Sequence, residues 1–293
     1  MPGSDVRQGS RCPVSARVLP PISLADIVGD PGPFLASLWG AQAGKFHCPA
    51  VLHLLCVAEI WELLDCGSLV APYFGIRRDD AGLTIAGVTQ TRIVQTRPMS
   101  MYADPEAIRA KVGAGSTLAL NQPEHWQAPI KELLAGLRGD LSAELRSSAF
   151  LSPSGASLLP VHSDAAHLFL VQLHGRIDWV VGEDGENTKL SLWPGDVLYV
   201  PAGHRHGEES RHGESLHLAI TVQQPTTREL AELALANFLS SARARDIAGT
   251  HHLMSPDEKV DWLRVELADF LQGYDVDALL AEAVADRQRR GVA

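Results

Sequence analysis

Histidine residues are concentrated in one stretch of the sequence. Seven of the twelve histidines lie between residues 162 and 217. Within this stretch the tripeptide HSD occurs at 162–164, and the run PAGHRH occurs at 201–206. Imidazole and carboxylate groups are the ligands preferred by several transition metals. These two segments therefore form a candidate metal site.

The spacing of the tripeptide matters because side chains alternate along a β-strand. Residues i and i+2 point the same way, so His162 and Asp164 would present an imidazole and a carboxylate side by side. A third ligand from His206 would leave coordination positions open, which suits non-haem Fe(II) better than structural zinc. Two alternatives stay open on spacing alone. His204 can replace His206 as the third ligand, or the histidines can be ordinary half-buried residues without a metal.

The composition is that of a folded protein. Of 293 residues, 45% are hydrophobic and 20% are charged, which excludes disordered, collagenous and coiled-coil classes. This length fits one large α+β domain with an appendage as well as two domains. The formal net charge of −10 argues against direct nucleic-acid binding, because a phosphate-binding groove would have to oppose the overall field. The same charge suits a basic peptide or protein partner.

The cysteines and the hydropathy of the sequence indicate the cellular compartment of the protein. The four cysteines, at positions 12, 48, 56 and 66, form no CxxC pair and are typical of reduced thiols. Segment 1–21 has no apolar run of signal-peptide length, and no apolar stretch elsewhere is long enough to cross a membrane. We therefore expect a cytoplasmic protein with no membrane association.

The first half of the chain alternates predicted helices and strands. Residues 1–22 have the composition of a loose, flexible tail, and 23–66 has a helical pattern with Pro49 at a first helical position. Strands at 73–77 and 83–88 flank an Asp-Asp-Ala-Gly turn and predict a hairpin. Further expected elements are a helix at 104–112, a strand at 116–121 and a helix at 123–141.

The region that follows is rich in short strands. Six strand-like runs are separated by turn sequences containing Gly, Pro, Ser and Asp. Many short strands joined by turns predict a β-sandwich or barrel. The expected strands are 145–151, 167–173, 177–181, 188–192, 197–201 and 215–222.

The last part of the chain is predicted to be helical. Thr226 and Ser255 each begin a capping-box pattern with glutamate three residues later. Apolar stripes follow both, and a third helix is expected from about 276 to 289. We expect residues 226–293 to form a helical cap or dimerisation region that follows a main domain spanning 23–225.

Six ordered pieces of the sequence resemble the JmjC-type cupin oxygenases, specifically the cupin-4 or ribosomal-oxygenase branch. Several pieces in the family's order are much harder to obtain by chance than any one of them. The likeness is strongest from 113 to 221 and covers most of the chain more weakly. The pieces are GAGSTLALN at 113–121, FLSPSG at 150–155, VHSD at 161–164, FLVQLHGR at 169–176, GDVLYVPAG at 195–203 followed by His206, and HLAIT at 217–221.

The resemblance implies a fold and a chemistry. The fold would be α+β, with a double-stranded β-helix (cupin or jelly-roll) core, N-terminal helices and a C-terminal helical cap that forms a homodimer. The chemistry would be that of a 2-oxoglutarate-dependent dioxygenase, a hydroxylase that uses Fe(II) and takes 2-oxoglutarate as cosubstrate. The alignment assigns metal binding and catalysis to His162, Asp164 and His206, makes His204 a pocket-wall residue and brings His217 near the metal. His167, His174 and His212 fall where the family has no ligand.

The sequence departs from the family at the residues that hold 2-oxoglutarate. A basic residue normally binds the distal carboxylate directly after the Gly-Arg pair, but here that position is Ile177. Arg176, one residue earlier, should point to the opposite face of the strand. The family's Asn and Tyr are replaced by Ser148 and Phe150. The candidates for a relocated anchor are Ser148, His217, Thr221 and Arg205.

A buried dicarboxylate without a cationic or well-donating partner is costly, so three interpretations follow. The anchor has moved, a different cosubstrate or none is used, or the site binds metal without turnover. Three functions compete accordingly. The first is hydroxylation of an amino-acid side chain in a protein or peptide. The second is the same chemistry on a small molecule or carrier-bound amino acid in specialised metabolism, and the third is a non-catalytic metal-binding cupin.

Overall fold

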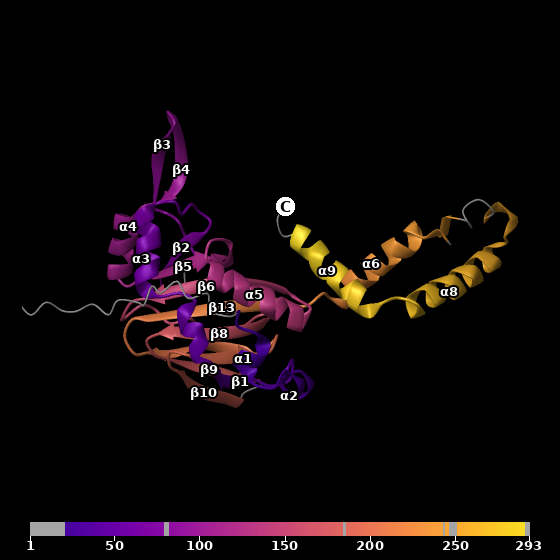
Figure 1. Cartoon of the computed structure of the whole chain (residues 1–293), viewed down its shortest axis with the longest axis horizontal. Helices are drawn as coiled ribbons and strands as arrows, with labels where there is room; N and C mark the ends of the chain where they lie inside the picture. Colours follow the sequence, from indigo (N-terminus) through magenta and orange to yellow (C-terminus); the bar gives the residue numbers. More distant parts are fainter. Residues whose placement is uncertain (1–20, 79–81, 184–185, 243, 246–250, 291–293) are drawn as a thin grey trace, which may run out of the picture. The chain divides into compact units, whose positions relative to one another are not determined.

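The computed structural model describes residues 21–78, 82–183, 186–242, 244–245 and 251–290 (Figure 1). The expected tail at 1–22 lies almost entirely outside these residues. The chain divides into two compact units, one made of Met1–Asp140 and Leu145–Val222, the other of Leu141–Glu144 and Gln223–Ala293. The first unit holds the strands and the second holds the C-terminal helices.

The N-terminal segment that was expected to be helical throughout is broken into short pieces. A strand interrupts it, because Gly44–His47 (β1) pairs with a strand from the later part of the chain. Pro49 begins a 3-10 turn and not the long helix, which starts only after Cys56, where the Cys56 amide donates to the Glu59 carboxylate. The pieces are α1 (Leu24–Val28), α2 (Pro31–Pro33), a π-helical turn (Phe34–Leu38), β1, a 3-10 turn (Pro49–His53) and α3 (Val57–Cys66).

The expected hairpin is displaced along the chain. The first strand forms as β2 (Phe74–Arg77), but 83–88 contributes only one bridge, between Thr84 and Ile76. The turn at 79–82 lies mostly outside the described residues. The hairpin that forms instead is β3 (Thr89–Val94) with β4 (Arg97–Ala103), a separate two-stranded sheet. Its turn residues, Gln95 and Thr96, adopt left-handed φ angles of 45° and 67° without a glycine, so it carries no sequence signature.

The next elements follow the sequence pattern closely. Asp104 caps a helix by accepting a hydrogen bond from the Ala107 amide, and Pro105 occupies its first position. The longer helix buries one apolar stripe, formed by Ile130, Leu133, Leu134 and Leu137. The elements are α4 (Pro105–Gly113), β5 (Thr117–Asn121), a 3-10 turn (Pro123–His125) and α5 (Ala128–Leu141).

The strand-rich region forms a jelly roll of two facing antiparallel sheets (Figure 1). One sheet has seven strands in the order β1-β11-β8-β13-β6-β5-β2, and the other has four in the order β10-β9-β12-β7. Two strands, β7 and β12, were not predicted from the sequence. The strands are β6 (Glu144–Ser152), β7 (His162–Ser163), β8 (His167–His174), β9 (Ile177–Glu183), β10 (Glu186–Leu192), β11 (Asp196–Val200), β12 (Arg205–Arg211) and β13 (Ser215–Gln223).

The space between the two sheets is filled by apolar side chains. The four-stranded sheet contributes Ile177, Trp179 and Val181 from alternate positions of β9. The seven-stranded sheet contributes apolar side chains from β8 and β11, which pair with each other. The remaining members of this cluster are Leu168, Leu170, Leu192, Leu198 and Val200. This core fixes which face of every strand points inward.

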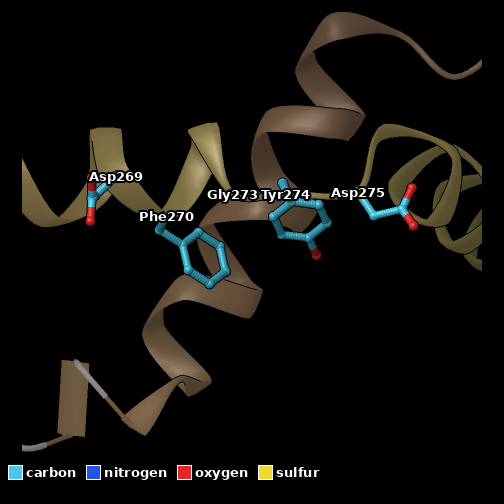
Figure 2. Close-up of a pocket in the computed structure, with 5 residues that line it drawn as sticks. All are labelled: Asp269, Phe270, Gly273, Tyr274 and Asp275. Atoms are coloured by element: carbon cyan, nitrogen blue, oxygen red, sulfur yellow. The ribbon is translucent and has the colours of Figure 1, made fainter.

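The C-terminal unit is helical, and its helices are α6 (Thr227–Ser240), α8 (Pro256–Gln272) and α9 (Val276–Arg290). Thr226 and Ser255 form the capping boxes that the sequence predicts. Phe238 packs against Phe270, with ring centroids 5.4 Å apart. A pocket at the turn between α8 and α9 is lined by Asp269, Phe270, Gly273, Tyr274 and Asp275 (Figure 2). Among the helices described, none combines the length and the apolar character that crossing a membrane requires.

Candidate functional site

Three side chains that are distant in the sequence meet on the four-stranded sheet. His162 on β7 lies directly opposite His206 on β12, and Asp164 follows β7 immediately. The Asp164 Oδ2 atom lies 3.5 Å from His206 Nε2 and 3.7 Å from His162 Nε2. One ligand atom from each residue lies within 4.8 Å of the others, a spacing that no other group of His, Cys, Asp or Glu side chains reaches in the described residues. The structure therefore brings together the three residues singled out from the sequence.

The second nitrogen of each histidine is held by a backbone carbonyl. His162 Nδ1 lies 2.9 Å from the Pro160 oxygen, and His206 Nδ1 lies 3.1 Å from the His204 oxygen. Because a carbonyl only accepts, each Nδ1 must carry the proton and donate it. With the proton on Nδ1, Nε2 is the nitrogen left to ligate a metal, and Nε2 of both histidines lies on the side of Asp164. The donor set of two neutral imidazoles and one carboxylate fits a divalent transition metal.

The local electrostatics favour the neutral form of His206. Its side chain is only 3% exposed, whereas those of His162 and Asp164 are 38% and 44% exposed. Burial, reinforced by the neighbouring His162, lowers the pKa of His206, while the His204 carbonyl and Asp164 partly oppose the shift. His206 therefore lies inside the barrel, whereas His162 and Asp164 are open to solvent, where a substrate can approach.

Backbone contacts hold the ligands in position. The Gly203 amide donates to the Asp164 carbonyl at 2.7 Å, so the PAGH turn fixes the carboxylate ligand. Gly207, next to His206, lies against the backbone of Val161, next to His162. A Cβ at Gly207 would lie 2.7 Å from Val161 Cα, a distance that real Cβ atoms essentially never show. Only glycine at this position lets the two ligand-bearing strands approach closely.

The other histidines lie away from the trio. His204 is buried but is not part of it, so the geometry favours His206 as the third ligand. His167 stacks on Trp39 with ring centroids 4.1 Å apart and bonds the Tyr199 hydroxyl. His174 is exposed near Glu214, and His212 pairs with Asp178. His174 and His212 are thus exposed, His167 lies at the start of β8, and none of the three belongs to the trio.

His217 lies deep in the barrel. Its ring stacks on Phe150 at 5.1 Å and meets Trp179 edge-on at 5.6 Å. Burial, assisted by the nearby positive charges of Arg211 and Arg77, lowers the pKa of His217 to about 3. The imidazole is therefore neutral at physiological pH, and it can offer a hydrogen bond but no positive charge.

The remaining anchor candidates provide no buried cation. Ser148 on β6 and Thr221 on β13 are half-buried hydroxyls. Arg205 is exposed and precedes His206 directly, so it points to the opposite face of β12. Arg176 also points outward, where it bonds Asp178 at 3.0 Å and stacks over Trp193, as its register predicts.

The sequence pattern did not identify a buried ion pair between Glu208 and Arg211. Both belong to β12, and their side chains are only 1% and 3% exposed. Two features hide this pair in the sequence: β12 carries no hydrophobic alternation, and a bulge between Glu208 and Ser210 shifts the register. The only available signal is a charged run, EESR, and it lies in a segment, 203–215, that is polar throughout.

Comparison with known proteins agrees with this architecture. A JmjC domain family model matches residues 185–230, which include β12 and the His206 ligand candidate. Ribosomal oxygenase 2 of Rattus norvegicus is 29% identical over 128 residues, covering 37% of this chain and 28% of that protein. Ribosomal oxygenase 1 of Homo sapiens is 26% identical over 190 residues, covering 56% and 29%. The chain is thus similar to JmjC-domain oxygenases. It spans less than a third of the length of these curated relatives.

Solved structures support the jelly-roll fold of the chain. The Escherichia coli ribosomal oxygenase YcfD, in complex with cobalt and 2-oxoglutarate, superposes with a TM-score of 0.52 at 19% identity. The match covers 84% of this chain and 68% of the YcfD chain. A second YcfD structure, with cobalt and succinic acid, gives a TM-score of 0.53 at 18% identity. At this identity the likeness supports the jelly-roll fold and does not by itself assign an activity.

Proposed function

We propose that this protein is an Fe(II)- and 2-oxoglutarate-dependent oxygenase that hydroxylates an amino-acid side chain in a protein or peptide. The observation that carries the proposal is the convergence of His162, Asp164 and His206 within 4.8 Å. Two imidazoles and one carboxylate on one side of an ion leave further positions for a chelating cosubstrate and for oxygen. The names of the relatives, ribosomal oxygenases 1 and 2, support the same reaction class.

The residues of the chain would have distinct roles in this reaction. When bound, Fe(II) with 2-oxoglutarate supplies oxidative C–H hydroxylation, in which 2-oxoglutarate is converted to succinate and carbon dioxide. His162, Asp164 and His206 would hold the ion, and the carbonyls of Pro160 and His204 keep the imidazoles in the ligating tautomer. The half-buried hydroxyls of Ser148 and Thr221 would be hydrogen-bond donors to the cosubstrate.

The proposed substrate is a basic protein or peptide. The net charge of −10 favours association with a positively charged partner and disfavours direct binding to nucleic acid. A relative from Branchiostoma floridae, 26% identical over 170 residues, is named a bifunctional lysine-specific demethylase and histidyl-hydroxylase, which acts on protein residues. Hydroxylation of a small molecule or carrier-bound amino acid is the competing outcome of the same test.

We further propose that the C-terminal helical unit, residues 226–293, serves dimerisation in the cytoplasm. Exposed apolar side chains on α6 and α8 support this role, since a second copy could cover them. They are Leu235, Leu239, Leu263 and Val265. The described cysteines, Cys48, Cys56 and Cys66, are not joined in disulfides, which fits a reducing compartment. Light scattering of the full chain tests the dimer: a monomeric mass at micromolar concentration would exclude it.

Anaerobic titration of the Fe(II)-loaded protein with 2-oxoglutarate tests the activity directly. We expect a visible charge-transfer band, because 2-oxoglutarate chelates the metal, and we expect succinate to form once oxygen is admitted. Mass spectrometry of basic ribosomal proteins incubated with the enzyme should then show a one-oxygen increase. Succinate formation that is stimulated only by free amino acids would favour the small-molecule substrate. A metal-loaded protein that gives no band at millimolar 2-oxoglutarate would be a non-catalytic cupin.

A further inference from the structure

Position 177 has an unusual cross-strand partner. The family resemblance assigns a basic residue to this position, but Ile177 is fully buried in the apolar core. In the register of β9 and β12, Ile177 lies directly opposite Arg211. Directly opposed residues project from the same face of a sheet, with Cβ atoms about 5 Å apart. The guanidinium of Arg211 is therefore delivered to the interior from the neighbouring strand.

Arg211 belongs to a buried cluster of charged groups. Its side chain forms an ion pair with Glu208, and it donates to the Ala156 carbonyl at 3.0 Å. Arg77 on β2 adds a second guanidinium. Burial is the main reason why the pKa values of Arg211 and His217 are lowered, and Arg77 contributes to both shifts. Arg77 is half-buried, and its positive charge adds to the field around Arg211 and His217.

The same cluster contains buried N–H groups that lack an acceptor. Arg211 Nε and Trp179 Nε1 are both buried without a hydrogen-bond partner, and each can only donate. His217 Nδ1 is likewise unpartnered, and so is one oxygen of Glu208. Unpaired buried donors are costly in a finished core, so their presence indicates a ligand that accepts hydrogen bonds. An acceptor-only anion, such as a carboxylate, satisfies the donors and suits the positive field of Arg211 and Arg77.

We propose that Arg211, assisted by Arg77, binds the distal carboxylate of 2-oxoglutarate in place of the missing basic residue at position 177. This inference rests on the proposed function, because it names the anchor of the cosubstrate in the same site. Arg211 acts as a positioning residue: it contacts the end of the cosubstrate that does not react. None of the four anchor candidates taken from the sequence brings a cation to this place.

The geometry along the strands is compatible with this role. His206 lies opposite Val181, and Arg211 lies opposite Ile177, so four positions of β9 separate the ligand from the anchor. Four strand residues correspond to about 13 Å. An arginine side chain that reaches back along the barrel and a five-carbon dicarboxylate on the metal together span such a separation. A basic side chain at position 177 would start from the same level of the barrel as Arg211.

The test compares two ligands that differ only at the distal end. 2-Oxoglutarate and 2-oxopentanoate share the chelating 2-oxo acid, but a methyl group replaces the distal carboxylate in the second. Calorimetry with the Co(II)-loaded protein gives the ratio of their dissociation constants. For the unmodified protein we expect 2-oxoglutarate to bind at least tenfold more tightly, as charge-assisted hydrogen bonds to a buried carboxylate require.

The decisive variant is Arg211→Met combined with Glu208→Gln, which removes both members of the ion pair and leaves no buried charge unpaired. We expect its selectivity ratio to fall toward one, while Co(II) stoichiometry and 2-oxopentanoate affinity stay unchanged. Arg176→Met is the matched control, since Arg176 adjoins position 177 but faces outward, and it should keep the ratio. An Ile177→Lys variant should not tighten 2-oxoglutarate binding, because the new cation would lie beside Arg211.

The outcomes separate this inference from the proposed function. If the double variant keeps full selectivity for 2-oxoglutarate, the anchor is not Arg211, although the oxygenase proposal stands. If the unmodified protein binds Co(II) but neither 2-oxo acid, both proposals fail together. Should the double variant not fold, as judged by circular dichroism, Arg77→Met decides instead: a severalfold loss of selectivity supports the inference and an unchanged ratio overturns it.

Discussion

The two faces of the β9–β12 strand pair differ in how their polar groups are satisfied. On the outer face, Asp178 accepts hydrogen bonds from Ser191, Ser210 and Arg176, and it lies 2.7 Å from His212 Nε2. On the inner face, Arg211 and Glu208 are more deeply buried, as is His217 on β13, and each retains a polar atom without a partner. The network around Asp178 is thus complete, whereas the polar groups of the inner face are not completely paired.

This difference separates structural polar residues from binding residues. Burial would raise the pKa of Asp178, but the hydrogen bonds from Ser191, His212, Ser210 and Arg176 together hold it well below its ordinary value. Such a satisfied carboxylate stabilises the fold. Buried polar atoms without partners destabilise it instead, so a protein retains them where a ligand completes them. Substitutions on each face should therefore produce different kinds of effect.

The largest contrast is expected between two histidines near the two ends of β12. His206→Ala on the inner face should abolish stoichiometric iron binding, because two ligands alone hold Fe(II) weakly. His212→Ala on the outer face should leave the iron content unchanged. Metal analysis after anaerobic loading measures both, with His162→Ala and Asp164→Ala expected to behave as His206→Ala does. Full iron content in the His206 variant would falsify the assignment of this residue as a ligand.

Gly207→Ala is expected to have the next largest effect. The added methyl group would collide with the Val161 backbone and push β7 away from β12, which separates His162 from His206. We expect at least a tenfold loss of metal affinity and a destabilisation of about 1–3 kcal/mol. Chelator competition and denaturant unfolding measure the two effects. Gly213→Ala, at a position where an added Cβ meets nothing within 4 Å but φ is +103°, controls for backbone strain alone.

Substitutions in the hydrogen-bond network around Asp178 on the outer face should have a smaller effect. Asp178→Ala removes the shared acceptor of four donors and should destabilise the protein by about 1–3 kcal/mol. The dissociation constants of Co(II) and 2-oxoglutarate should remain within twofold of those of the unmodified protein, since the carboxylate points away from the site. A Ser191→Ala variant, which loses one donor only, should cost less. A large loss of cosubstrate affinity in Asp178→Ala would contradict the distinction between an outer face that stabilises the fold and an inner face that binds the cosubstrate.

The smallest expected effect is a change in the free energy of unfolding with pH. His217 has a pKa of about 3 in the folded protein against about 6.5 in an unfolded chain, so the unfolded state binds more protons between these values. Stability contributed by this group is present above pH 6.5 and is lost as the pH falls toward 3, at no more than about 1.4 kcal/mol per pH unit. Asp178 has a lowered pKa as well, but its contribution is lost only below about pH 3.8.

Unfolding of the metal-free protein between pH 6.5 and 5.0 therefore reports on the buried histidines, since burial lowers the pKa values of His167 and His206 as well as that of His217. His217→Gln should reduce the slope of stability against pH in this range, whereas Asp178→Asn should leave it unchanged and act only at lower pH. Equal slopes in His217→Gln and in the unmodified protein would show that His217 is not one of the groups that titrate.

Much of the site could be predicted from the sequence because its signals are local. The HSD tripeptide orders an imidazole and a carboxylate by strand alternation alone, and the PAGHRH run places two histidines after a glycine turn. The family resemblance favoured His206 over His204, and the pairing of β12 with β7, which puts His206 opposite His162, supplies the physical reason. The sequence did not predict the hairpin of β3 and β4, because its turn residues, Gln95 and Thr96, are not typical of turns.

The sequence by itself determined the residue types of the metal site, the strand-rich core and the absence of a basic residue at position 177. Only the tertiary structure decided where a replacement cation lies. Counting alternate residues from His206 would turn Arg211 outward, but the bulge between Glu208 and Ser210 inserts one residue and reverses the alternation. Such a bulge arises from pairing with a distant strand, so the inward direction of Arg211 follows from contacts across the sheet and not from local sequence.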